Sequence, residues 1–181
     1  MKTIILTYAT PSEKPDVAEL KKELLSKNII LEPLCTGVGK INAYSSLLEA
    51  ITHQTVAVIN VGTCGSATEK IGTVLLCGVF TDLDLIEHTS ADTVFFSNNS
   101  NCYTSDRFVT SSDIRFQACD MEAYPQALLC KNRGLKFISI KCVTDIVGNN
   151  DLEVYESNKA DAVSNLSKYL TISSVLKILD L

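Results

Sequence analysis

Acidic side chains stand at two places in this sequence where a strand is expected to end. Asp120 and Glu122 belong to the run Asp-Met-Glu-Ala at a predicted strand-to-helix junction, and Asp145 follows a buried strand in the run Val-Thr-Asp. Taken singly, such an acid is a helix cap or a solvated loop residue. Carboxylates at the ends of neighbouring strands instead converge on one cleft. Burial there raises one pKa for proton donation, while another carboxylate stays ionised and accepts hydrogen bonds from hydroxyl groups.

A second candidate is the run Gly-Thr-Cys-Gly-Ser at positions 62–66, which follows a short apolar strand. Small residues at this spacing resemble a nucleophile elbow with Cys64 as the nucleophile. That chemistry needs a His base with an orienting acid. His53 falls in a predicted helix and His88 in a predicted loop, so neither has the right context. The preferred interpretation is a turn that presents backbone N–H groups and the Thr63 hydroxyl to a ligand.

A third glycine-rich run, Thr-Gly-Val-Gly-Lys at 36–40, follows a strand and opens a helix. A P-loop would need Gly where Leu34 stands and Ser or Thr where Ile41 stands, and a dinucleotide fingerprint would need a third Gly where Asn42 stands. The run therefore predicts a tight turn that lets a helix pack on the sheet. Lys40, at the start of that helix, is expected to point to solvent.

Length and composition limit the classes of function. The chain has 181 residues, of which 46% are hydrophobic and 20% charged, as in an ordinary soluble protein, and we expect one domain over residues 1–181. A net charge of −5 and a pI near 5.0 offer no basic face for a nucleic acid. No run reaches the ~18 apolar residues of a membrane span, and the N-terminus is too short for a signal peptide. The predicted location is the cytoplasm, without membrane contact.

The cysteines agree with that location. There are seven, with no Cys-x-x-Cys pair, and most lie in apolar runs where a reduced Cys behaves as a small hydrophobe. Neither histidine has a ligand-like spacing with them, so no metal site is predicted.

Apolar periodicity alternates between strand-like and helix-like segments, which predicts an α/β fold. The stretch 82–107 is rich in Asp, Ser, Asn and Thr and is expected to be irregular, as either a binding loop or a surface excursion. The expected strands are 2–8, 29–35, 56–61, 73–80 and 135–143, and the expected helices are 15–28, 40–53, 122–134 and 156–179.

Four runs, in this order, resemble the purine nucleoside phosphorylase and nucleosidase superfamily, and most closely the 5′-methylthioadenosine/S-adenosylhomocysteine nucleosidases. The resemblance covers almost the whole chain. It implies a three-layer α/β/α sandwich with a central mixed sheet, hydrolysis of a purine ribonucleoside, no metal or organic cofactor, and a homodimer. The runs are Gly-Val-Gly-Lys-Ile-Asn-Ala at 37–43, Ile-Asn-Val-Gly-Thr-Cys-Gly at 59–65, Asp-Met-Glu-Ala at 120–123 and Val-Thr-Asp at 143–145.

The resemblance also implies roles for residues that match the motifs. Glu122 would bind the ribose hydroxyls, with Met121 packed under the sugar. Asp145 would protonate the purine at N7 as the glycosidic bond breaks, and Thr144 beside it belongs to the same substrate-binding motif. Thr63 would lie near the ribose and the nucleophile.

Three further residues are carried over from less well matched segments. Thr-Ser-Asp-Arg-Phe-Val at 104–109 resembles the segment that stacks on the base and reads its edge, which implicates Phe108 and Val109. In the nucleosidases a Glu after the first strand activates water, and Glu13 is the only Glu in that stretch.

Differences from the family pattern indicate whether the nucleophile is water or phosphate. The chain is short, and a hairpin expected between the first helix and Gly37 is missing. A phosphorylase has Arg where Asn60 stands and an early Gly-Asp-Pro loop, both of which hold phosphate. Water is therefore favoured over phosphate, and 5′-methylthioadenosine or S-adenosylhomocysteine is the expected substrate. A phosphorylase, or a nucleoside-binding protein without catalysis, remains open as an alternative.

Overall fold

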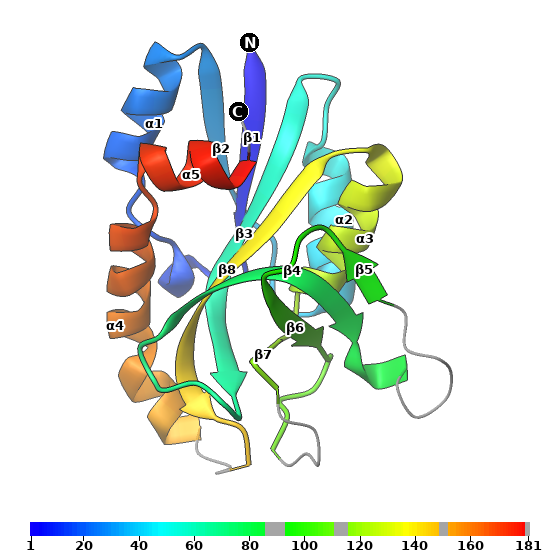
Figure 1. The fold of residues 1–181 in the computed structure, drawn as a ribbon, viewed down its shortest axis with the longest axis vertical. Coiled ribbons are helices and arrows are strands. Elements are labelled where there is room, and N and C mark those ends of the chain that lie inside the picture. Colours follow the sequence, from blue (N-terminus) through cyan, green and yellow to red (C-terminus); the bar gives the residue numbers. More distant parts are fainter. Residues whose placement is uncertain (86–92, 111–115, 149–151, 180–181) are drawn as a thin grey trace.

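A mixed sheet between two groups of helices forms the body of the protein (Figure 1). This computed structural model describes residues 1–85, 93–110, 116–148 and 152–179. The predicted three-layer α/β/α architecture is confirmed. Helices α1, α4 and α5 cover one face of the sheet, and α2 and α3 cover the other.

The order of elements follows the predicted alternation of strand and helix. The strands are β1 Lys2–Tyr8, β2 Ile29–Cys35, β3 Thr55–Ser66, β4 Val74–Asp82, β5 Thr93–Phe95, β6 Ser100–Thr104, β7 Ala118–Asp120 and β8 Lys136–Ile146. The helices are α1 Ala18–Ser26, α2 Lys40–Ala50, α3 Ala123–Arg133, α4 Leu152–Tyr169 and α5 Ile172–Leu179, with short 3-10 turns η1 Pro11–Glu13 and η2 Leu83–Leu85.

The sheet is open at one end and closes on itself at the other. β1 lies between β2 and β3, and all three run parallel. Beyond β3 the described strands form a ring, because β3 pairs with both β7 and β8, β8 pairs with β4, and β6 joins β4 to β7. The ring brings the ends of β3, β7 and β8 together, and the candidate site lies there.

Alternation along the strands divides the core between the two faces. On β1, Ile4 and Leu6 point into the apolar cluster under α1, α4 and α5, whereas Ile5 points into the cluster under α2 and α3. Because both faces are covered, β1 is apolar throughout its centre, as expected for a central parallel strand.

Two sequence predictions about elements are wrong in part. The stretch 82–107, predicted to be irregular, contains η2, β5 and β6; residues 86–92, including His88, lie outside the described residues. β6 is a polar run that is ordered by pairing with β4 on one side and β7 on the other. The helix predicted over 156–179 is two helices, because Thr171 and Ser174 exchange side-chain and backbone hydrogen bonds and cap the start of α5.

A buried ion pair crosses the ring of strands. Lys141 of β8 lies 2.7 Å from Asp120 of β7, and both side chains are about 1% exposed. Burial would lower the pKa of Lys141, but the negative charge of Asp120 outweighs it and raises that pKa. Asp120 also accepts hydrogen bonds from the Thr104 hydroxyl and from the Ala123 N–H, so it fixes β6 and the start of α3 as well.

Removing the lysine tests how far the fold depends on this pair. Lys141→Met leaves Asp120 charged and buried without its partner, and we expect the free energy of unfolding to fall by about 3–5 kcal/mol. Urea denaturation followed by circular dichroism measures it. The double variant Lys141→Met/Asp120→Asn removes both charges and should regain part of that loss.

The matched control is Lys22→Met, which breaks the exposed pair with Glu19 on α1 and should leave the urea midpoint unchanged. If Lys141→Met unfolds at the same urea concentration as the wild type, the pair does not stabilise the ring.

Candidate active site

An open cavity lies where β3, β7 and β8 end. Its volume of about 190 Å³ exceeds by an order of magnitude the ~10–15 Å³ that one water needs on this measure, so it has room for a small metabolite. The described residues that line it are Ala9, Thr10, Glu13, Val38, Thr63, Cys64, Gly65, Arg107, Phe108, Val109, Cys119, Asp120, Met121, Glu122, Asp145, Val147, Leu152 and Tyr155.

The cavity brings together seven of the eight residues selected from the sequence. The exception is Thr144, which does not line the cavity and lies behind Asp145. The seven come from the N-terminal segment, β3, the segment after β6, the β7–α3 junction and β8, which are far apart in sequence.

Glu13, at the end of η1, is buried against β3. Its Oε1 accepts a hydrogen bond of 2.7 Å from the Thr63 hydroxyl, and its Oε2 accepts one of 3.1 Å from the Thr10 hydroxyl. The residue is 5% exposed although it is acidic and lines a cavity. Two hydroxyl donors therefore hold this carboxylate in one orientation.

A β-bulge aims Asp145 into the cavity. β3 and β8 pair in register up to Cys64 and Val143, after which Gly65 pairs with Asp145, so Thr144 is an extra residue on β8. β-Bulges next to active sites change the direction in which a side chain points. A side-chain carbon on Gly65 would come within 2.8 Å of the Asp145 carboxylate, so Gly65 leaves the space that this carboxylate occupies.

Thr144 holds Asp145 from behind. Its hydroxyl donates to Asp145 Oδ1 at 2.8 Å and lies 3.2 Å from the Cys64 carbonyl oxygen. Burial raises the pKa of Asp145, and the hydrogen bond from Thr144 acts in the opposite direction. The net shift is upward, which favours a carboxyl group that holds a proton.

Glu122 immediately precedes α3 and faces the glycine-rich turn before α2. Gly39, at a φ of 92° that favours glycine, donates its N–H to Glu122 Oε1 at 3.0 Å. Burial and the charges of Asp120 and Glu13 raise the pKa of Glu122 to about 7, although Lys141 and the Gly39 N–H oppose the rise. Met121, next to Glu122, also lines the cavity.

An ionic cluster holds the segment that carries Phe108 and Val109. Lys40 Nζ lies 2.9 Å from Asp82 and 2.7 Å from Asp84, and Asp106 accepts a hydrogen bond of 2.7 Å from the Lys40 N–H. Burial alone would raise the pKa of Asp84, but the hydrogen bonds from Lys40 and its neighbours lower it to about 2. The prediction that Lys40 points to solvent is therefore wrong, because three carboxylates surround its ammonium group.

The interpretation of 62–66 as a turn is also wrong, because these residues continue β3. Cys64 is 4% exposed, and burial raises its pKa well above the ordinary value. His53 is exposed in the turn after α2. A buried neutral thiol without a histidine beside it in the described residues does not support a cysteine hydrolase.

Sequence reasoning missed three residues of the site and its support. Lys141 was hidden in an apolar strand, where a single lysine is itself a signal of a buried charge partner. Tyr155 and Arg107 also line the cavity. Nothing local distinguishes Tyr155 from a surface residue, whereas Arg107 lies in the run 104–109 that was singled out for Phe108 and Val109 alone.

The described residues contain no cluster of three or more His, Cys, Asp or Glu side chains arranged to hold a metal ion. In the same ranges, no helix has both the length and the apolarity of a bilayer-crossing segment.

Comparison with solved structures identifies the fold. A nucleosidase for 5′-methylthioadenosine and S-adenosylhomocysteine from Colwellia psychrerythraea, in complex with adenine, superposes with a TM-score of 0.76 at 19% identity and covers 99% of this chain and 95% of its own. The corresponding nucleosidase of Helicobacter pylori gives 0.79 at 16% identity, over 98% and 99%. Futalosine hydrolase of Helicobacter pylori gives 0.78 at 15% identity, over 97% of each chain.

The chain has the nucleosidase fold. No family model and no curated protein sequence matches it, so the likeness rests on three-dimensional structure. The resemblance inferred from four short runs of sequence is confirmed at the level of the fold.

The raised pKa of Glu122 makes a prediction about stability. Because this pKa is about 7 in the folded protein against 4.5 ordinarily, the folded state keeps a proton between these pH values that the unfolded chain has lost. The contribution of Glu122 to the free energy of unfolding therefore falls as the pH rises through this interval. Glu122→Gln cannot ionise, and we expect it to be more stable than the wild type by up to about 3 kcal/mol at pH 8 and equal to it at pH 4.

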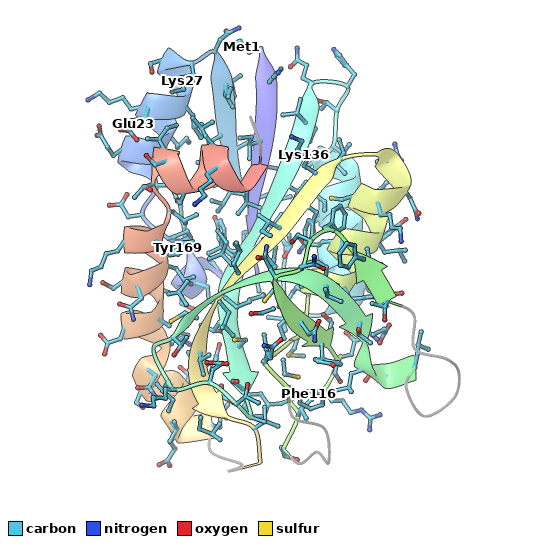
Figure 2. The ribbon with its side chains drawn as sticks, in the orientation of Figure 1. Met1, Glu23, Lys27, Phe116, Lys136 and Tyr169 are labelled. Carbon is cyan, nitrogen blue, oxygen red and sulfur yellow. The ribbon has the colours of Figure 1, made fainter. Side chains whose placement is uncertain are left out.

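Thermal unfolding of both proteins from pH 4 to pH 8 measures the difference. Glu23→Gln, at a half-buried position on α1 that does not line the cavity (Figure 2), is the matched control and should follow the wild type throughout. A Glu122→Gln protein that loses stability with pH as the wild type does would show that Glu122 carries no such strain.

Proposed function

We propose that this protein is an enzyme that hydrolyses the N-glycosidic bond of a purine ribonucleoside and releases the free base. 5′-Methylthioadenosine and S-adenosylhomocysteine are the first candidate substrates. The observation that carries the proposal is the placement of Glu13 and Asp145 against one face of β3, with Glu122 on the same cavity.

β3 sets the spacing of the two carboxylates. Glu13 is bonded to Thr63 and Asp145 lies against Gly65. Positions 63 and 65 share one face of the strand and are roughly 7 Å apart. The strand therefore holds the two acidic side chains at successive positions along the same face, on one cavity.

Asp145 is assigned the role of general acid. As the C–N bond breaks, negative charge builds on the purine, and a proton donated to the base, at N7, makes it a better leaving group. Burial favours the protonated form of Asp145, and the Thr144 hydroxyl holds its carboxyl group in place. The family resemblance adds Phe108 and Val109 as the residues that stack on the base and read its edge.

Glu122 is assigned to the sugar. The ribose becomes positively charged as the base departs, and a carboxylate beside it both accepts hydrogen bonds from the hydroxyl groups and stabilises that charge. Met121 would pack under the ring. The Gly39 N–H keeps one Glu122 oxygen oriented, while the other is available to the ribose.

Glu13 is assigned the role of general base. It would take one proton from water as the water oxygen bonds to the anomeric carbon, so that the products are the free purine and a free ribose derivative. Thr63 and Thr10 hold the carboxylate, and the Thr63 hydroxyl lies next to the attacking water in this assignment.

The charge of the cavity argues for water over phosphate. Its described lining includes four carboxylates, from Glu13, Asp120, Glu122 and Asp145, and one guanidinium group, from Arg107. Asn60 is neutral, and its buried side chain forms hydrogen bonds with Thr7 and Ser139. Lys40 is paired with the carboxylates of its ionic cluster. Lys141 neutralises Asp120, and the Glu13 carboxylate, which Thr63 and Thr10 hold on the cavity, would repel a phosphate dianion, with Arg107 as the one cationic side chain in the described lining.

The substrate assignment draws on the solved structures of similar fold. They include nucleosidases for 5′-methylthioadenosine and S-adenosylhomocysteine and a futalosine hydrolase. The seven cysteines are free thiols, which fits the predicted cytoplasmic location.

We also propose that the protein is a homodimer through α2. Ile41, Tyr44 and Leu48 are spaced to share one side of this helix, and they are 78%, 37% and 38% exposed. Val38, which precedes the helix, is 45% exposed and lines the cavity. A second copy seated on α2 would cover this apolar stripe and come close to the mouth of the cavity.

Product analysis tests the enzymatic proposal. We expect the wild type to release free base from at least one nucleoside in a panel of 5′-methylthioadenosine, S-adenosylhomocysteine, futalosine, adenosine and inosine, at full rate in phosphate-free buffer. Asp145→Asn should lower kcat by about 10²–10⁴-fold with an unchanged circular dichroism spectrum, because it removes the proton donor.

Two outcomes would favour the alternatives. A sugar 1-phosphate that forms only when phosphate is present identifies a phosphorylase. Tight nucleoside binding without release of base identifies a binding protein. Near-normal kcat in Asp145→Asn would remove this residue from the mechanism.

Disrupting the stripe on α2 tests the dimer. Ile41→Glu places a charge in the centre of the proposed interface, and we expect it to convert a dimeric wild type into a monomer in sedimentation experiments. Leu25→Glu on α1, which replaces a side chain that is 57% exposed, is the control and should remain dimeric. A monomeric wild type would refute the interface.

A further inference from the structure

We propose that Arg107, at the rim of the cavity, binds an anionic group of the substrate, so that this protein prefers purine nucleosides whose 5′ substituent carries a carboxylate. This inference deepens the proposed hydrolysis and rests on it. It separates the two first candidate substrates, because S-adenosylhomocysteine carries the carboxylate of an amino acid at its 5′ end and 5′-methylthioadenosine carries none.

The charges of the cavity are divided between its floor and its rim. Outside the buried ion pair, the acidic residues in the described lining are Glu13, Glu122 and Asp145. These three residues, the floor acids, are only 5–7% exposed. Arg107 is exposed and is the one cationic residue in the same lining. A ligand in the cavity therefore meets negative charge at the floor and positive charge at the rim.

Hydrogen bonds hold the backbone that carries this arginine. The Arg107 N–H donates to Ser105 Oγ at 3.1 Å, and the Ser105 hydroxyl donates to Asp84 at 2.7 Å. Asp84 also accepts the Asp106 N–H at 3.0 Å and pairs with Lys40 at 2.7 Å. The backbone at Arg107 is thus fixed before any ligand binds, and binding has to order only the side chain.

The guanidinium group has no ion-pair partner among the described residues. Its neighbour in sequence, Asp106, is engaged by Lys40, whose backbone N–H donates to Asp106 Oδ1 at 2.7 Å and whose Nζ lies 3.9 Å from Oδ2. The floor acids do not reach Arg107 either, because none of the ion pairs in the described ranges includes them. The five N–H donors of the guanidinium group can therefore serve a ligand.

A carboxylate fits such a group, because the planar fork of an arginine donates two parallel hydrogen bonds to it. A purine base and the ribose hydroxyls are neutral, so the negative charge has to belong to a substituent. Glu122 is assigned to the ribose hydroxyls, which leaves the 5′ carbon to carry that substituent. The floor acids repel an anion and Arg107 attracts it, so the charges also fix the direction in which such a nucleoside enters the cavity.

Two nucleosides that differ only in charge test the proposal. Both carry a carboxyethylthio group in place of the 5′ hydroxyl, and in the second the carboxylate is converted to its primary amide; each is prepared on adenosine and on inosine. We expect the wild type to have a kcat/KM about tenfold higher for the acid, as a charge-assisted hydrogen bond exceeds a neutral one. The difference should lie in KM, because the contact is remote from the bond that breaks.

Arg107→Gln should lower the ratio of kcat/KM for the acid over the amide about tenfold, to near one. Arg107→Lys keeps the charge without the planar fork and should keep part of the preference. Arg133→Gln is the matched control, since Arg133 is exposed in the last turn of α3 and does not line this cavity; it should keep the wild-type ratio. A wild type without a preference for the acid overturns the proposal, as does an Arg107→Gln protein that keeps the wild-type ratio.

Calorimetric titration separates this inference from the proposed hydrolysis. If the wild type releases base from neither nucleoside, the hydrolysis is refuted, and the inference is then decided by binding alone. The acid should bind the wild type about tenfold more tightly than the amide, and Arg107→Gln should remove this advantage. A wild type that binds neither nucleoside, or both equally, overturns the inference.

Free phosphate could occupy the same guanidinium group, and measurements with and without it distinguish the two sources of negative charge. We expect release of base from the amide to be independent of phosphate in the wild type. If release requires phosphate in the wild type and Arg107→Gln no longer responds to phosphate, the arginine holds the nucleophile rather than the substrate, and the inference is wrong.

Discussion

The buried pair of Lys141 and Asp120 is the interaction on which the site depends. It joins β8 to β7 inside the ring, and Asp120 extends the connection to β6 through Thr104 and to α3 through the Ala123 N–H. A charge in this position is tolerable only with its partner in place. The same pair therefore selects one arrangement of the ring strands and sets where the segment containing Glu122 enters the cavity.

Small residues on β3 leave room for the acidic side chains of the site and hold them in place. A side-chain carbon on Gly62 would lie within 4 Å of Lys141 Nζ and Glu13 Oε1. Gly65 leaves free the space that the Asp145 carboxylate fills. Between these glycines, Thr63 provides the hydroxyl that holds Glu13. Alternation along a strand places Thr63 and Gly65 on one face, and the bulge at Thr144 brings Asp145 of β8 opposite Gly65.

The acidic side chains that face the cavity lower the stability of the folded protein, and the proposed reaction explains why they are there. Four carboxylates face one cavity, and burial together with the neighbouring acids raises the pKa of Glu122 to about 7. A substrate that becomes cationic during the reaction relieves this repulsion, so the strain favours the transition state over the empty site. In the cluster around Lys40, by contrast, three carboxylates share one ammonium group.

The sequence by itself determined the layered α/β architecture, since the apolar periodicity of the long strands and helices is a local property. It also singled out Asp145 and Glu122, because short motifs carry the residue types that the chemistry needs, and Glu13, because it is the only Glu after the first strand. Only the tertiary structure decided that Cys64 is buried in a strand, that the polar segment after β4 contributes β6 to the sheet, and that Tyr155 faces the site. Each of these features depends on residues far away in the sequence. A strand becomes ordered by pairing with neighbouring strands, and the role of a side chain depends on the residues on the other side of the cavity.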